Sequence, residues 1–127
     1  MRYTKLTKLK SPPKLDAFFY KTEMGAEPVK EWLLALTKTD RKQIGSDVSY
    51  VQFKWPIGKP QVDHLRGAIW EIRTTLKTRI ARILFAVEGN NMVLLHGFIK
   101  KTQATDKNDI DLAEVRYKDW KQHHEKK

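Results

Sequence analysis

Seven basic side chains are clustered in one stretch of the chain that otherwise has the apolar, β-branched pattern of strands. They are Arg66, Arg73, Lys77, Arg79, Arg82, Lys100 and Lys101, and the only acidic residues among them are Glu71 and Glu88. Folding alone does not require such a cluster, because like charges held close together repel one another. A polyanion does require it, and the planar fork of arginine suits the paired oxygens of a phosphate. The cluster therefore favours a nucleic-acid partner, with single-stranded or ribosome-bound RNA as the leading candidate.

The same side chains could cleave RNA without a metal ion. The ribose 2′-hydroxyl would attack the adjacent phosphorus and form a 2′,3′-cyclic phosphate, which requires a base, a proton donor to the leaving 5′-oxygen and stabilising cations. Clustered cations lower the pKa of a lysine, so that a lysine could serve as a proton shuttle. Glu71 is the only carboxylate within 68–75 and 79–87, and it acts either as the base or as a group that orients Arg73. A purely structural alternative is that Arg73 and Arg82 pair with Glu71 and Glu88 across the sheet.

We therefore predict two sets of site residues. Catalytic roles are assigned to Arg73, Arg82, Lys100, Lys101 and Glu71, and contacts with RNA to Arg66, Lys77, Arg79 and Trp70. Trp70 could stack on a base, although aromatic side chains on strands belong more often to the core. Surplus lysine that merely aids solubility is the alternative explanation of the charge.

Other site chemistries have little support in the residues. His96 alternates with apolar neighbours, a pattern more typical of a packed sheet-face residue than of a catalyst. His64 falls in an expected loop, and His123 and His124 fall in the tail. No pair of histidines has the spacing of metal ligands, the chain has no cysteine, and no glycine-rich phosphate-binding motif is present. We expect neither a metal ion nor a cofactor.

Length and charge indicate a single small domain. The 127 residues carry a net charge of +10, and a second basic cluster lies in residues 1–14, which we expect to be a flexible arm. No apolar run approaches the roughly 18 residues of a membrane-spanning helix. We expect a soluble, cytoplasmic protein without a membrane partner.

Hydrophobic periodicity predicts the elements that must position these residues. A helix is expected from Glu27-Pro28, and a second one, capped by Thr39 and Asp40, runs to Trp55, so that the two form a helical hairpin. A first strand at 15–21 and a loop at 56–67 flank this hairpin. Three strands at about 68–75, 79–87 and 92–100 form an antiparallel meander, with a turn at 88–91. Thr105 caps a final helix, and residues 121–127 form a frayed tail.

Four segments of the chain resemble a known family. They are FFYKTEMGAEPVKEWLLAL, HLRGAIWEIR, ARILFAVEGNNMVLLHGFIKKTQ and the helix at 105–116. In this order they resemble the RelE/ParE toxin superfamily, specifically its HigB-like, phage-derived branch, over about 15–120. The resemblance implies a single RelE-like α+β domain at 15–120. In that fold a two-helix hairpin packs on a curved antiparallel sheet of about four strands, followed by a C-terminal helix.

The resemblance also implies a function. It implies the toxin of a type II toxin–antitoxin system, a ribosome-dependent and metal-independent endoribonuclease that cleaves translated mRNA and is neutralised by a co-encoded helix-turn-helix antitoxin. The basic residues of the family site fall on Arg73, Arg82 and Lys100-Lys101. Many relatives have an aromatic residue where this chain has Ala81, and the tyrosine or histidine that some relatives use has no counterpart after Lys101. A ParE-type poison of DNA gyrase and a passive RNA-binding module are the alternatives.

Overall fold

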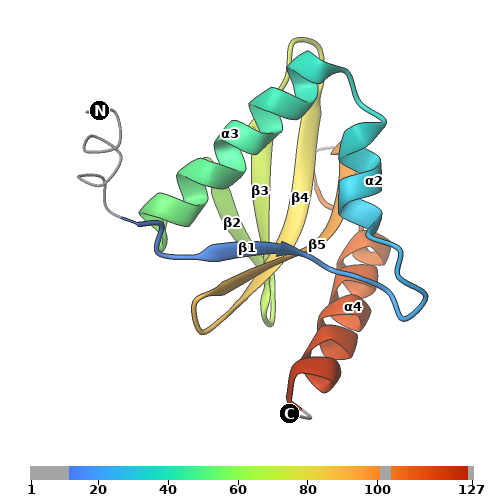
Figure 1. Ribbon diagram of the computed structural model, residues 1–127. Coiled ribbons are helices and arrows are strands. Elements are labelled where there is room, and N and C mark those ends of the chain that lie inside the picture. The colour runs from blue at the N-terminus through green and yellow to red at the C-terminus, as the bar shows by residue number, and fades with distance from the viewer. Residues whose placement is uncertain (1–11, 101–103, 126–127) are drawn as a thin grey trace, which may run out of the picture.

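The β-branched runs that follow Gly67 form the centre of a five-stranded sheet, and helices cover both of its faces (Figure 1). The computed structural model describes residues 12–100 and 104–125. Along these residues the elements are β1 (Asp16–Phe19), α2 (Pro28–Leu34), α3 (Lys38–Lys54), β2 (Val62–Arg66), β3 (Ile69–Thr75), β4 (Ile80–Glu88), β5 (Asn91–Lys100) and α4 (Lys107–Glu125). The predicted α+β class, the helical hairpin, the antiparallel meander and the C-terminal helix are confirmed.

The sheet has the strand order β1-β5-β4-β3-β2, and two features of this order differ from the prediction. The segment 62–66 is a strand paired antiparallel with β3, although we predicted a loop there. Its sequence, VDHLR, is polar with one fully buried residue, as expected of an edge strand held by backbone hydrogen bonds. β1 pairs in parallel with β5, so that the sheet has five strands and is mixed instead of four-stranded and antiparallel.

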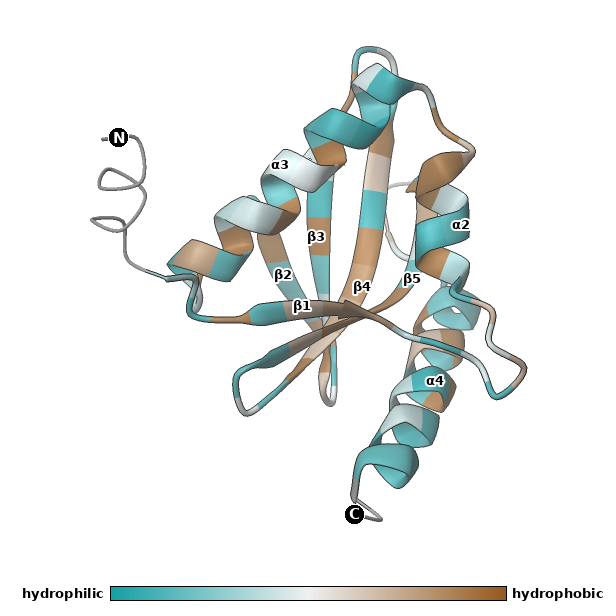
Figure 2. Ribbon diagram, in the orientation of Figure 1, coloured by the Kyte–Doolittle hydropathy of each residue, from teal (hydrophilic) through white to brown (hydrophobic). Residues whose placement is uncertain are grey.

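Each face of the sheet has its own hydrophobic cluster. The cluster under α2 and α3 includes Val29, Ile44, Val51, Ile72, Ile83, Phe85, Met92 and Leu94. The cluster under α4 includes Tyr20, Ile69, Leu84, Ala86, Val93, Leu95, Ala113 and Trp120. Figure 1 shows α3 running diagonally across β2, β3 and β4. Figure 2 shows hydrophobic and hydrophilic residues alternating along both long helices, because each helix has one face on the sheet and one in water.

The capping residues of α3 and α4 lie one or two positions before or after the residues that we predicted. Thr37 caps α3 by accepting a 3.1 Å hydrogen bond from the backbone N–H of Asp40, so Thr39 is not the cap. At the start of α4 the backbone N–H of Asn108 donates to the side chain of Asp106, which leaves Thr105 for another role. The helix then continues to Glu125, so the part of the predicted frayed tail that lies within the described residues is helical.

The predicted arm, 1–14, lies largely outside the described residues. Lys14 is described, and its backbone N–H donates to the carbonyl of Gln52 at the end of α3. Within 12–100 and 104–125, no helix is long and apolar enough to cross a membrane.

Candidate active site

The register of the three central strands aligns polar residues in rows on the face that α4 partly covers. One row is Glu71 on β3, Leu84 on β4 and His96 on β5, and the next is Arg73, Arg82 and Phe98. A third row is Thr75, Ile80 and Lys100. We call Arg73, Arg82, Lys100 and Glu71 the cationic face. Four of the five residues predicted to be catalytic therefore share one side of the sheet, and the fifth, Lys101, lies outside the described residues.

A β-bulge in β5 decides which side chains reach this face. Phe85 pairs with Leu94, but the next residue back along β4, Leu84, pairs with His96, so Leu95 is an extra residue. Leu94 packs in the cluster under the helical hairpin, whereas Leu95 and Phe98 pack on the α4 side. Simple alternation from Leu94 would have turned His96, Phe98 and Lys100 toward the hairpin. Bulges commonly re-aim side chains next to functional sites.

Arg82 and Glu71 form a buried ion pair at the centre of the cationic face. Their side chains are 5% and 1% exposed, and Arg82 Nη1 lies 2.6 Å from Glu71 Oε1. The Thr105 hydroxyl donates to the other carboxylate oxygen, Oε2, and accepts a weaker hydrogen bond of 3.3 Å from Arg82 Nη1. The pairing of Arg82 with Glu71 is one part of the structural alternative considered from the sequence, whereas Glu88 accepts a hydrogen bond from the Tyr117 hydroxyl. Because both of its oxygens have partners, Glu71 is poorly placed to act as a base.

Arg73 lies directly opposite Arg82 across β3 and β4. Like charges in this position destabilise a sheet. The carboxylate that could have paired with Arg73 is instead engaged by Arg82. Arg73 is half-buried, and its Nε is buried without a hydrogen-bond partner among the described residues. A buried donor without a partner is costly, so the fold gains nothing from this arrangement.

Lys100 is the cation whose protonation the site perturbs. Burial lowers the pKa of Lys100 below its ordinary value, and the positive charge of Arg82 lowers it further. The carboxylates of Glu71, Asp109 and Asp106 act in the opposite direction, with smaller effects. A lysine with a lowered pKa is more often neutral near physiological pH, which is the state that accepts a proton.

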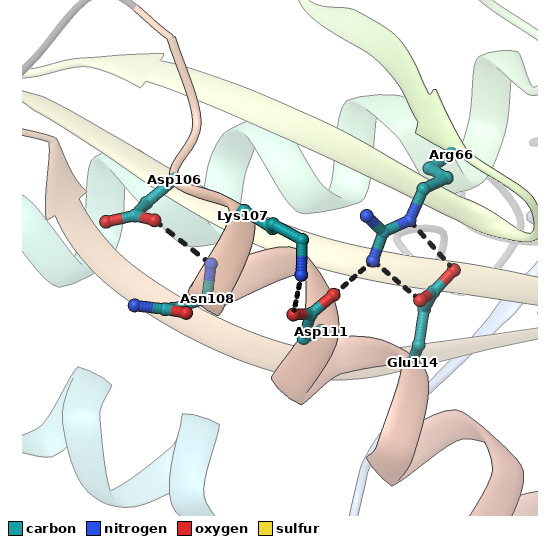
Figure 3. Close-up of polar contacts among 6 residues, drawn as sticks. All are labelled: Arg66, Asp106, Lys107, Asn108, Asp111 and Glu114. Atoms are coloured by element: carbon teal, nitrogen blue, oxygen red, sulfur yellow. Dashed lines mark hydrogen bonds and ion pairs between the residues drawn. The ribbon is translucent and has the colours of Figure 1, made fainter.

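The residues predicted to contact RNA are not brought together. Figure 3 shows the Arg66 guanidinium turned toward two carboxylates of α4. Its Nη2 lies 2.7 Å from Glu114 and 2.5 Å from Asp111, and these carboxylates, Glu114 first, raise the pKa of Arg66. These ion pairs give Arg66 a structural role that does not require RNA, since they join α4 to the end of β2.

The other three predicted RNA contacts lie elsewhere. Lys77 and Arg79 are exposed in the turn between β3 and β4, where Arg79 pairs with Asp40 of α3 at 2.8 Å. Trp70 lies on the opposite face of the sheet and packs edge-on against Trp55, with ring centroids 5.1 Å apart. Trp70 thus belongs to the core under the helical hairpin, as aromatic residues on strands usually do.

Sequence reasoning missed the contacts of three residues in this region, Thr105, His96 and Asp109. Thr105 was predicted to be a helix cap, but it binds Glu71 from 34 positions away. His96 Nε2 lies 2.7 Å from Asp109 Oδ1 in the first turn of α4, and its ring stacks on Phe98 with centroids 5.1 Å apart. Neither contact has a local sequence signal, because both depend on how α4 docks on the sheet. Within 12–100 and 104–125, no three His, Asp or Glu side chains are grouped so that they could hold a metal ion.

The cationic face thus places the half-buried Arg73 and Lys100, whose pKa is lowered, beside the ion pair of Arg82 and Glu71.

A family model described as Phage derived protein Gp49-like (DUF891) matches residues 31–118 of the chain. The match contains the whole cationic face, together with Thr105 and the first turn of α4. No curated protein sequence matches the chain.

Proposed function

Because the chain belongs to the phage-derived Gp49-like family, a family of RelE-like toxins, we propose that it is the toxin of a type II toxin–antitoxin system. We further propose that it cleaves translated mRNA on the ribosome, by attack of a ribose 2′-hydroxyl and without a metal ion. A co-encoded helix-turn-helix antitoxin would keep it inactive.

The observation that carries this proposal is the opposition of Arg73 and Arg82 across two strands, with Lys100 on the same face. The single carboxylate in these rows is taken by Arg82, and Arg73 keeps a buried N–H without a partner among the described residues. A neutral, apolar side chain at position 73 would remove both the like-charge contact and the unpartnered donor. A like-charge pair and a buried donor without a partner are costs that proteins accept mainly at functional sites. A phosphate would supply the missing acceptor and the missing negative charge.

Each group on the cationic face has a place in this reaction. Arg73 would bind the scissile phosphate and stabilise the charge that develops on its oxygens in the transition state. Lys100, whose pKa is lowered, would accept the proton of the attacking 2′-hydroxyl. Arg82 would contribute its charge from beneath the surface, held in place by Glu71 and Thr105. Lys101, predicted from the sequence to be catalytic, keeps that assignment as part of the proposal.

Primer extension on a reporter mRNA after brief expression tests the proposal. Wild type should produce discrete cuts within translated codons. Arg73→Met and Lys100→Ala should reduce cleavage by about 10²–10³-fold, the usual effect of removing one group that stabilises transition-state charge. Lys30→Ala is a matched control, because Lys30 is an exposed lysine on α2 whose ion pair with Glu27 is a long surface contact of 3.8 Å.

Stability measurements separate a lost activity from a lost fold. Arg73→Met removes a like-charge contact, so it should unfold at a urea concentration equal to or above that of wild type. A variant that is at least as stable and yet inactive identifies a residue kept for function. Normal cleavage by both variants would refute the site. Intact mRNA with growth arrest and a DNA-damage response would indicate gyrase poisoning, and intact mRNA with normal growth a binding module.

A further inference from the structure

We propose that His96 donates the proton to the leaving 5′-oxygen of the cleaved RNA, and that Asp109 of α4 positions its ring. This inference rests on the proposed nuclease function and names the acid that the sequence left unidentified. It also makes the first turn of α4 part of the reaction.

The contacts of His96 hold its ring in a fixed position, as an acid requires. The carboxylate of Asp109 lies 2.7 Å from Nε2, and one face of the ring stacks on Phe98. A carboxylate in this position fixes the orientation of an imidazole. Both side chains remain accessible, with 18% of His96 and 28% of Asp109 exposed. Among the described residues the ring makes no other hydrogen bond, so Nδ1 is available to a substrate.

The bulge in β5 puts His96 on the correct side of the sheet. Without the extra residue, Leu95, His96 would share the hairpin side with Leu94. With it, His96 and Lys100 lie four residues apart on one face, which is about 13 Å along a strand. The row of Arg73, Arg82 and Phe98 runs between them.

This spacing suits an in-line displacement at phosphorus. The attacking and leaving oxygens lie on opposite sides of the phosphorus in such a reaction, so its base and its acid must approach from opposite sides. A phosphate over the row of Arg73 and Arg82 would have Lys100 on one side and His96 on the other.

The proposed step balances as follows in atoms and charge. The 2′-oxygen forms a bond to phosphorus while its proton passes to the neutral amine of Lys100. The bond from phosphorus to the 5′-oxygen breaks, and the imidazolium of His96 donates a proton to that oxygen. The products are a 2′,3′-cyclic phosphate and a free 5′-hydroxyl, with Lys100 protonated and His96 neutral.

A sulfur substitution at the leaving atom tests this role directly. A ribosome-bound mRNA would carry one 5′-bridging phosphorothiolate at the cleaved linkage, because a thiolate leaves without being protonated. His96→Gln should slow cleavage of the ordinary mRNA by about 10²–10⁴-fold, the usual contribution of a general acid. On the sulfur substrate the same variant should stay within a few-fold of wild type. Asp109→Asn should show the same pattern with a smaller loss, and His123→Gln, on the exposed end of α4, should match wild type on both substrates.

The comparison of two substrates within one variant does not depend on how much of that variant is folded. If His96→Gln loses cleavage rate equally on the oxygen and sulfur substrates, or loses none on the oxygen substrate, His96 is not the acid. Cleavage by wild type in the same experiment would leave the nuclease proposal standing. If wild type cleaves neither substrate, the proposed function fails, and the role of His96 fails with it.

Discussion

Removing Arg82 should destabilise the protein severely, and removing its partner at the same time should restore most of the lost stability. In Arg82→Met the carboxylate of Glu71 stays almost fully buried and keeps its hydrogen bond from the Thr105 hydroxyl. The opposite variant, Glu71→Leu, leaves the guanidinium of Arg82 buried without its carboxylate. In the double variant two apolar side chains of similar volume fill the same space.

The magnitude follows from the burial of both groups. Breaking a buried ion pair on one side costs about 3–5 kcal/mol, because the remaining charge has lost its partner and cannot reach water. For a domain of this size each kcal/mol lowers the melting temperature by roughly 3–5 °C, so Arg82→Met should melt about 9–25 °C below wild type. The double variant should lie within about 2 kcal/mol of wild type, since the lost Thr105 hydrogen bond contributes about 1 kcal/mol.

Urea unfolding followed by tryptophan fluorescence measures these free energies, and the four proteins form a double-mutant cycle. A coupling of several kcal/mol between positions 71 and 82 is expected. If Arg82→Met unfolds within 1 kcal/mol of wild type, the pair is not buried in solution and the reasoning is wrong. Cleavage of mRNA should also be measured with the folded double variant. Cleavage that survives in this variant would show that the role of Arg82 is purely structural.

Two further predictions concern other contacts of the fold. Burial and a hydrogen bond to a carboxylate of α4 raise the pKa of Tyr20 to about 12 from 10.0. Between these pH values the unfolded chain loses the proton and the folded chain keeps it, so stability falls as pH rises. Tyr20→Phe should remove that part of the slope, and ultraviolet titration of tyrosinate should lose one late component; an unchanged titration would contradict the assignment. Gly97→Ala should cost roughly 1–3 kcal/mol in urea unfolding, because its Cβ would lie 2.4 Å from the Trp32 ring. Gly45→Ala in α3 meets no atom within 4 Å and should stabilise by about 0.5–1 kcal/mol, so equal effects of the two would refute the packing argument.

The elements with strong periodicity or distinct turn residues could be predicted from the sequence. Proline at position 28 starts α2, and Gly89 with φ of 61° makes the turn between β4 and β5. The two faces of β3 follow the simple alternation of a strand, since Glu71 lies on one side of the sheet and Trp70 on the other. These features are local, because a few neighbouring residues determine them.

The edge strands could not be predicted in the same way. β2 is held by its ladder with β3, and its polar residues carry no alternation that marks a strand. β1 has a strand pattern, but nothing in it shows that its partner is β5 or that the two run parallel. β1 and β5 lie more than 70 residues apart in the sequence. Their pairing depends on how the helical hairpin between them docks on the sheet, and no local pattern reports that.

The sequence by itself determined that cations would gather on a small sheet, because strand alternation and the clustering of charge along the chain are local properties. Only the tertiary structure decided what each cation does. The bulge at Leu95 turned His96 and Lys100 toward Arg82, and the docking of α4 brought Asp109 to His96. Packing buried Arg82 in an ion pair with Glu71, and among residues 12–100 and 104–125 it gave Arg73 no carboxylate partner. Burial and the pairing of distant groups arise only when the chain is packed, which is why no spacing along the sequence could reveal them.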